Sequence, residues 1–177
     1  MDWKILSESV EYENPWFKVL KKRVDTGLRE EDWFLTNSNY NAVIIFPITQ
    51  EGKIVFIKQF RLGAGKTVLE LPAGFIDENE SPEKAAVREC SEETGYEVEK
   101  TELIAELNVR ESRTEDKDYV FVVKVGKQKT QKLEGSENIQ TILLTPKEAL
   151  EKTFNGEIKG AEYVATTLLC LLKKNLL

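Results

Sequence analysis

The chain has 177 residues, of which 41% are hydrophobic and 32% charged, a balance typical of a globular protein rather than a disordered one. Its net charge of −6 argues against a nucleic-acid partner, because binding a phosphate backbone requires clustered lysines and arginines. The sequence contains no histidine and only two cysteines, Cys90 and Cys170, which excludes Ser-His-Asp catalysis, histidine-ligated metals and a four-ligand zinc site.

The beginning of the chain has no secretion signal pattern. Its first 17 residues carry acidic side chains where a signal peptide needs a basic segment and an apolar run. The longest apolar stretch, residues 168–172, is too short to span a bilayer. We therefore expect a cytoplasmic protein with no membrane partner.

Strands dominate the first two thirds of the sequence. Residues 42–49 form a nearly continuous apolar run, which predicts a strand buried on both faces, and residues 53–60 are expected to return as its hairpin partner. The other predicted strands cover residues 3–12, 16–24, 31–36, 68–71, 102–110, 118–125 and 139–144.

Three helices are predicted between and after these strands. Ser81-Pro82 is a start signal and Gly95 a stop signal for the first, while the others cover residues 146–154 and 161–175. Irregular alternation of strands and helices indicates an α+β fold or a mixed-sheet sandwich rather than a regular doubly wound fold. We expect an N-terminal strand region over residues 1–40, forming a small antiparallel sheet, and a main domain over residues 41–177.

The first predicted helix carries an unusual concentration of negative charge. Glu89, Glu92 and Glu93 fall within an arc of about 100° on a helical projection. A solvated helix face is the ordinary interpretation of such acids. However, Arg88 is the nearby cation, and the mutual repulsion of the glutamates is relieved if a divalent cation binds among them. Carboxylate oxygens of this kind suit Mg²⁺ or Mn²⁺.

The same projection predicts how this helix packs. It places Ala85 and Ala86 on the carboxylate face, where small side chains leave room beside the acids. Val87, Cys90 and Thr94 fall on the other side, which we expect to pack on the sheet.

Residues 74–96, GFIDENESPEKAAVRECSEETGY, resemble the Nudix box. Two aliphatic positions of the motif are softened here to Cys90 and Tyr96. All seven fixed positions of the motif are present, namely Gly74, Glu80, Arg88, Glu89, Glu92, Glu93 and Gly95.

The resemblance implies a Nudix-type α+β fold, in which a mixed β-sheet is sandwiched between helices. It also implies a Mg²⁺-dependent cleavage of a diphosphate linked to another moiety, with Mn²⁺ as a possible substitute. It implies that Glu89 and Glu93 are direct metal ligands, that Glu92 is a ligand or supports one, and that the carbonyl of Ala73 is a further ligand. Arg88 would orient Glu92 or Glu89 in catalysis. Glu80 would brace the loop without touching the metal.

Residues 58–77, KQFRLGAGKTVLELPAGFID, resemble the ADP-ribose pyrophosphatase group of this family. By that resemblance Arg61 would contact the substrate phosphates, and Glu70 the terminal ribose or the metal network. Glu137 aligns with a loop glutamate that acts as metal ligand or catalytic base, with Glu134 and Glu115 as the second and third candidates. A solvated loop glutamate is the alternative interpretation of Glu137.

The N-terminal region fits the same group, whose members form homodimers through N-terminal strands and stack the adenine between aromatic side chains. Trp16 and Trp33 lie where such aromatics fall, although a core or interface tryptophan explains them equally well. One departure is the segment NVRESRTEDKD, residues 108–118, which lacks the group's proline and carries Arg110 and Arg113. The sugar and base therefore stay open.

The sequence thus favours a metal-dependent pyrophosphohydrolase that cleaves ADP-ribose, or a related nucleoside diphosphate sugar, to a nucleoside monophosphate and a sugar phosphate. One alternative is a non-catalytic Nudix module that senses nucleotides. Another is a house-cleaning hydrolase of damaged nucleoside triphosphates, against which the N-terminal extension and the ELPAG segment argue.

Overall fold

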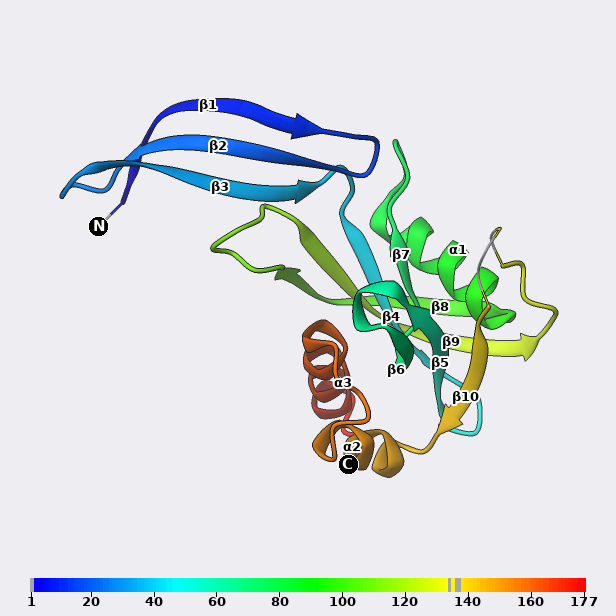
Figure 1. Cartoon of the computed structure of the whole chain (residues 1–177). Coiled ribbons are helices and arrows are strands. Elements are labelled where there is room, and N and C mark those ends of the chain that lie inside the picture. The colour runs from blue at the N-terminus through cyan, green and yellow to red at the C-terminus, as the bar shows by residue number, and fades with distance from the viewer. Residues whose placement is uncertain (1, 134, 136–137) are drawn as a thin grey trace. The chain divides into compact units, whose positions relative to one another are not determined.

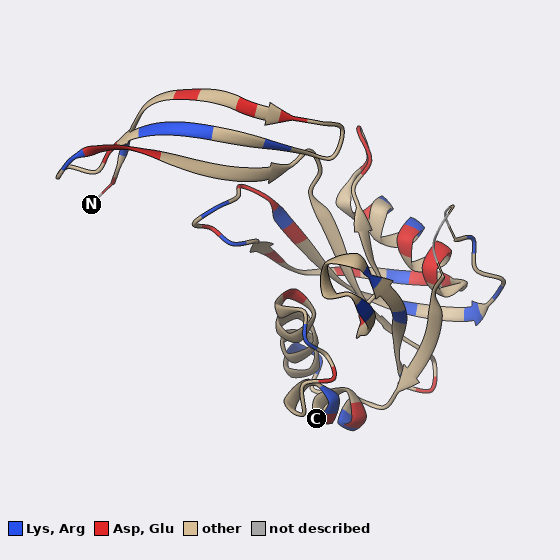
Figure 2. Cartoon of the chain, in the orientation of Figure 1, with Lys and Arg blue, Asp and Glu red and all other residues tan. Residues whose placement is uncertain are grey.

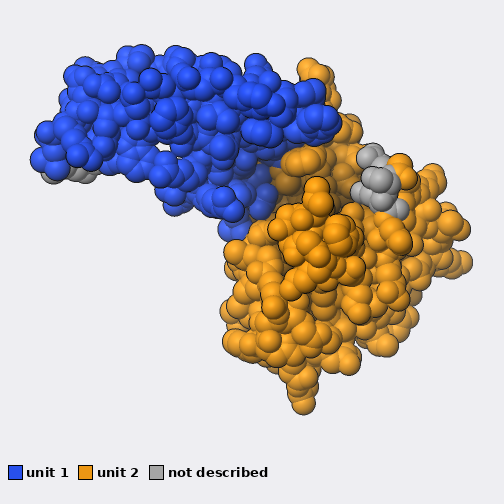
Figure 3. Space-filling view, viewed as in Figure 1, with its two compact units in different colours: residues 1–41, 107–118 blue, residues 42–106, 119–177 orange. Residues whose placement is uncertain are grey.

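The computed structural model describes residues 2–133, 135 and 138–177. The chain divides into two compact units, which are coloured separately in Figure 3. The first comprises residues 1–41 and 107–118, and the second residues 42–106 and 119–177. The first unit therefore includes a segment that the sequence analysis assigned to the main domain.

The first unit is built on a three-stranded antiparallel sheet in the order β1-β2-β3, which confirms the predicted small N-terminal sheet (Figure 1). Its strands are β1 (Lys4–Glu13), β2 (Phe17–Asp25) and β3 (Glu30–Ser38). Leu20 and Val24 of β2 are buried, whereas every residue of β1 is exposed. Burial in this unit is thus concentrated on the central strand.

Charge complementarity holds this small sheet together. Figure 2 shows the basic residues of β2 between acidic residues of β1 and β3. Lys21 and Arg23 of β2 both bind Asp32 of β3, at 3.1 and 3.0 Å. Opposite charges on neighbouring strands stabilise their register, because like charges in the same places would repel.

The second unit contains a seven-stranded sheet with the order β10-β5-β4-β9-β8, to which β6 adds beside β5 and β7 beside β4. The central strand β4 (Ala42–Ile48) is buried over Val43 to Pro47, as the apolar run predicted. The other strands are β5 (Ile54–Arg61), β6 (Lys66–Glu70), β7 (Ala73–Phe75), β8 (Tyr96–Asn108), β9 (Lys117–Gln128) and β10 (Gln140–Leu144).

Helices cover both faces of this sheet, as predicted (Figure 1). They are α1 (Pro82–Thr94), α2 (Pro146–Phe154) and α3 (Ala161–Lys173), and a short 3₁₀ turn, η1 (Leu62–Ala64), joins β5 to β6. α1 packs on Val43 and Ile45 of β4, and α3 also contacts that strand. The mixed sheet between helices confirms the predicted α+β class.

Two strand assignments from the sequence need correction. The short strand β7 was not predicted, because three residues between a proline and a loop carry no detectable alternation. β8 begins at Tyr96, well before the predicted start at residue 102, because pairing within the sheet extends it through a charged stretch. In the described part of the chain, no helix is long and apolar enough to cross a membrane.

Candidate active site

The acidic residues of the motif are presented by α1, whose two ends are fixed by local signals. The Ser81 side chain accepts a hydrogen bond from the backbone N–H of Lys84, and Pro82 occupies the first helical position. At the other end Gly95 adopts φ 74°, and its N–H donates to the carbonyl of Ser91. A Cβ at Gly95 would lie 2.3 Å from the Lys129 carbonyl oxygen, so both backbone angle and space require glycine there.

The packing face of α1 differs from the predicted one. Cys90 and Thr94 are buried as predicted, but Ala85 and Ala86 are fully buried as well, so they pack in the core instead of leaving room beside the acids. Val87, predicted to pack, is 37% exposed. The small alanines allow α1 to approach the sheet closely, so the buried face of the helix also includes Glu93.

Glu93 lies at the inner edge of this face and is 3% exposed. Its Oε2 accepts a hydrogen bond from the backbone N–H of Ala73 at 3.0 Å. A buried carboxylate requires such partners, because transfer from water without them is costly. The bond joins α1 to the start of β7 and places the carboxylate beside the Ala73 peptide.

Glu89 comes still closer to the same strand. A Cβ built on Gly74 would lie 2.0 Å from the Glu89 Cδ and 2.1 Å from its Oε1. No side chain fits there while Glu89 keeps its position. The first glycine of the motif is therefore explained by the space that the Glu89 carboxylate occupies.

Arg88 contacts three glutamates of the cluster. Its guanidinium binds both oxygens of Glu80, with Nη2–Oε2 at 2.8 Å and Nε–Oε1 at 3.1 Å, and also donates to the Phe75 carbonyl. Its Nη1 reaches Glu89 at 2.7 Å and Glu92 at 3.4 Å. The bond to Glu80 raises the pKa of Arg88, and the same bond lowers the pKa of Glu80. This bidentate pair joins the loop before α1 to the helix.

The oxygens of this cluster are donors of the kind that a divalent cation binds. Glu89, Glu92 and Glu93 offer hard carboxylate donors, and the Ala73 peptide adjoins Glu93. Among the described residues, no group of three or more acidic or thiol side chains is gathered as a ready-made metal site. Instead, Glu89 and Glu92 contact Arg88, and Glu93 contacts an N–H group. These positive partners offset part of the negative charge that a bound dication would also offset.

Arg61 and Glu70 form a second group with a residue that the sequence analysis missed. The Arg61 guanidinium contacts the Glu70 carboxylate at 2.7 Å and the Tyr163 hydroxyl at 3.5 Å. Burial raises the pKa of Glu70, against the opposing effect of its bond to Arg61. Burial also raises the pKa of Tyr163. Tyr163 belongs to α3, and no local pattern in the sequence marks its contact with β5.

The remaining candidates are in the first unit or outside the described residues. Trp16 is 69% exposed, while Trp33 packs edge-on against Trp3 with a ring-centroid distance of 5.1 Å. The Arg113 guanidinium lies 4.9 Å from the centre of the Trp33 ring.

Of the three candidate bases, Glu115 is the one that lies among the described residues. Glu115 binds Lys22 at 2.5 Å and Asn37 at 3.0 Å within the first unit, which gives it a structural partner on each side. Glu134 and Glu137 lie outside the described residues. Lys132, which precedes them in the sequence, donates its backbone N–H to the Glu92 carbonyl at the end of α1.

The chain is similar to a known protein family and to several known proteins. The NUDIX domain model matches residues 39–165. The chain is 31% identical over 123 residues to the ADP-ribose pyrophosphatase of Bacillus subtilis, a match covering 68% of this chain and 66% of that protein. It is 30% identical over 164 residues to the GDP-mannose pyrophosphatase of Yersinia pestis, covering 84% of this chain and 82% of that protein.

Other relatives are more varied in their names. The methanol dehydrogenase activator of Bacillus methanolicus is 35% identical over 112 residues, covering 62% of this chain and 60% of that protein. The chain thus spans less than two thirds of the length of this relative and of the Bacillus subtilis protein. A solved structure described as an ADP compounds hydrolase superposes with a TM-score of 0.87 at 18% identity, covering 100% of this chain and 98% of that one, which shows a shared fold.

Proposed function

The chain belongs to the Nudix family, and from this premise we propose that it is a Mg²⁺-dependent pyrophosphohydrolase. The proposed substrate is ADP-ribose or a related nucleoside diphosphate sugar, and the products are a nucleoside monophosphate and a sugar phosphate. The observation that carries the proposal is the single cluster of Glu80, Arg88, Glu89 and Glu92, joined by one guanidinium.

The metal-holding residues of the proposal are Glu89, Glu93, Glu92 and the carbonyl of Ala73, with Mn²⁺ as a possible substitute for Mg²⁺. When bound, the ion would neutralise the diphosphate and lower the pKa of an attacking water. Arg88 acts as the positioning residue, because it holds Glu89 and Glu92 from one side while Glu80 fixes its other edge. The Ala73 N–H fixes Glu93 in the same way.

A carboxylate must take the proton from the attacking water, because the chain contains no histidine. We assign that role to Glu137, with Glu92 as the other catalytic carboxylate. Glu115 is the weaker candidate, since Lys22 lowers the pKa of that carboxyl and thereby its basicity. Proton transfer to the leaving phosphate group is then unnecessary at neutral pH, because that group departs as an anion.

The proposed substrate contacts are those expected from the sequence. Arg61 would contact the phosphates, and Glu70 would bind the terminal ribose or support the metal network. Trp16 and Trp33 would stack on the base, which suits exposed and half-buried aromatic rings. We further propose a cytoplasmic homodimer formed through the strands of residues 1–40.

The proposal is tested with a panel of substrates containing ADP-ribose, GDP-mannose, UDP-glucose and 8-oxo-dGTP. Hydrolysis is measured with Mg²⁺ or Mn²⁺ by phosphate release in the presence of a phosphatase. We expect a nucleoside diphosphate sugar to give the highest kcat/KM, in keeping with the named activities of two relatives.

Two results would replace this proposal by another. Tight ADP-ribose binding without hydrolysis in either metal would indicate a nucleotide-sensing module. A higher kcat/KM for 8-oxo-dGTP than for any diphosphate sugar would indicate a house-cleaning hydrolase.

A further inference from the structure

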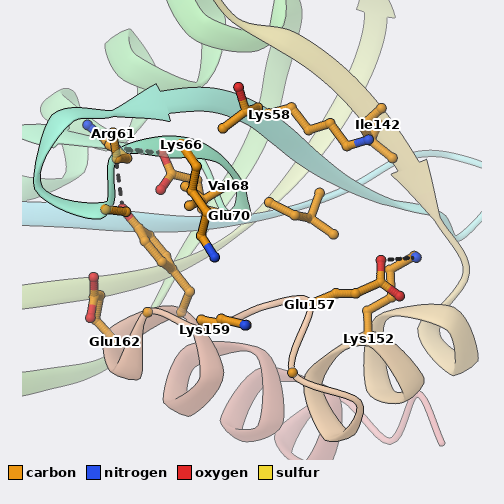
Figure 4. Close-up of a pocket in the computed structure, with 16 residues that line it drawn as sticks. Lys58, Arg61, Lys66, Val68, Glu70, Ile142, Lys152, Glu157, Lys159 and Glu162 are labelled. Atoms are coloured by element: carbon orange, nitrogen blue, oxygen red, sulfur yellow. Dashed lines mark hydrogen bonds and ion pairs between the residues drawn. The ribbon is translucent and has the colours of Figure 1, made fainter.

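A large cleft in the second unit contains none of the acidic residues of α1. It has a volume of about 1010 Å³ and lies between the strands β5, β6 and β10 and the helices α2 and α3 (Figure 4). This volume is at the upper end of the range of small-molecule sites. Neither Ala73 nor any of Glu89, Glu92 and Glu93 lines it.

The charge of this cleft is opposite to that of the whole protein. Five basic and three acidic side chains line it, a balance of +2 in a chain whose net charge is −6. Two of the three acids are already neutralised, because Glu70 is bound to Arg61 and Glu157 to Lys152, each at 2.7 Å. Glu162 is the remaining acid.

Three lysines account for the excess positive charge of the cleft. In the described part of the chain, Lys58, Lys66 and Lys159 each lie beyond ion-pair distance of any carboxylate. Figure 4 shows Lys66 reaching from the sheet toward the side of the cleft on which Lys159 lies. Ammonium groups gathered in one cleft repel each other and focus a positive potential, which a bound anion relieves.

The cleft also has apolar walls and a helix end. Val68, Leu69 and Ile142 line it from the strands, and the Tyr163 ring lines it from α3. Gly160, the N-cap residue that precedes α3, also lines the cleft and has no side chain to cap the first turn. The free N–H groups of a first helical turn add favourable potential for an anion.

We propose that this cleft binds a small organic phosphate monoester, with its phosphoryl group between Lys66 and Lys159 and its organic part against Val68, Leu69 and Ile142. Lysine ammonium groups bind phosphate as point charges and do not require a planar partner. The site needs no metal ion, since its positive charge comes from the protein. It contains none of the acidic residues of the cluster on α1, but it shares Arg61 and Glu70 with the proposed substrate contacts and in that part rests on the proposed function.

The test uses adenosine 5′-monophosphate as the probe, in titration calorimetry on the whole protein with EDTA present. We expect one molecule to bind per chain, and unphosphorylated adenosine to bind at least about tenfold more weakly, because a charge-assisted hydrogen bond accounts for about that factor. Lys66→Ala/Lys159→Ala should weaken binding about tenfold or more. Both lysines are exposed, so the variant is expected to fold.

Control variants distinguish the effect of losing lysines in this cleft from the effect of losing positive charge elsewhere on the protein. Lys127→Ala/Lys147→Ala removes the same charge from exposed positions outside it and should keep the affinity within about twofold. Glu93→Gln should also keep it.

Each contrary result overturns the proposal. These results are no probe binding in EDTA, adenosine binding as tightly as the monophosphate, equal losses in the two lysine variants, or loss of binding in Glu93→Gln. The failure of hydrolysis in the substrate panel would leave this result unaffected, because the probe binds without metal.

Discussion

The acidic cluster on α1 and the lysine-lined cleft differ in whether their charges are paired within the protein. In the cluster, Arg88 binds three glutamates and a backbone N–H holds Glu93, so each acid has a positive partner within the protein. In the cleft, Lys58, Lys66 and Lys159 lie beyond ion-pair distance of the described carboxylates. The difference indicates that the cluster is organised before any ligand arrives, whereas the cleft gains its counter-charge from a ligand.

The largest expected effect comes from removing a charge of the cluster without changing its shape. In Glu93→Gln the side-chain oxygen can still accept the hydrogen bond from the Ala73 N–H, but the negative charge that we propose for metal binding is lost. We expect kcat to fall on the order of 100-fold or more, with little change in melting temperature. The matched control is Glu78→Gln at an exposed loop position, where activity should stay within twofold. Equal activity of both variants would contradict the metal role of Glu93.

A second test compares how tightly the two regions are packed. Gly74→Ala forces the Glu89 carboxylate to move, since the new Cβ would lie 2.0 Å from its Cδ. We expect a loss of about 1–3 kcal/mol in the free energy of unfolding, measured by denaturant titration, together with a large loss of activity.

Its control lies in the turn η1, next to Ala64 of the cleft. Gly63→Ala meets no atom within 4 Å, so the free energy of unfolding should change by less than about 0.5 kcal/mol. If Gly74→Ala and Gly63→Ala behave alike, the close approach of Glu89 does not exist in solution.

A third test removes the hub of the acidic cluster. Arg88→Met leaves Glu80, Glu89 and Glu92 without their shared cation, and we expect the free energy of unfolding to fall by about 1–2 kcal/mol in EDTA. Mg²⁺ should then raise the melting temperature more in the variant than in the parent, because the dication relieves the added repulsion. Arg29→Met removes an exposed arginine paired to Glu31 and should show neither effect. A smaller Mg²⁺ response in Arg88→Met would argue against binding of the ion among these acids.

The smallest expected effect concerns pH. Arg88 lowers the pKa of Glu80 in the folded state, so this pair stabilises the protein above the unfolded-state pKa and loses that contribution as pH falls through the folded-state value. Glu80→Gln should therefore reduce stability near neutral pH by less than about 1 kcal/mol, and the difference from the parent should shrink on acidification below about pH 4. Denaturant titrations at neutral and acid pH measure it, and a difference that grows on acidification would contradict the pairing.

Much of the fold could be predicted because its signals are local. Ser81-Pro82 and Thr145-Pro146 fix the starts of two helices through side-chain caps, and the apolar run of residues 42–49 marks the central strand. The projection predicted the packing of Cys90 and Thr94, but it did not predict how far burial extends around α1. The burial of Ala85 and Ala86 and the exposure of Val87 are decided by the close packing of the helix on the sheet.

In the candidate site, too, the residues that are close in sequence could be predicted and those that are distant in sequence could not. The residues of the box share one helix and one loop, so their spacing in the sequence already indicates one cluster. Tyr163 and the lysines of the cleft come from strands, helices and loops that are distant in sequence, and nothing local marks them as neighbours. Individually, Lys58, Lys66 and Lys159 resemble ordinary surface lysines.

Gly95 affects how loss-of-function data on this protein should be interpreted. Its backbone angle and the adjacent Lys129 carbonyl leave no place for a side chain at the point where the chain leaves α1. A library of variants scored only by turnover would rank this glycine beside the glutamates that we propose to bind metal, although it contributes no chemistry. Scoring the amount of soluble protein in parallel would separate positions that the reaction requires from positions that the chain requires in order to fold.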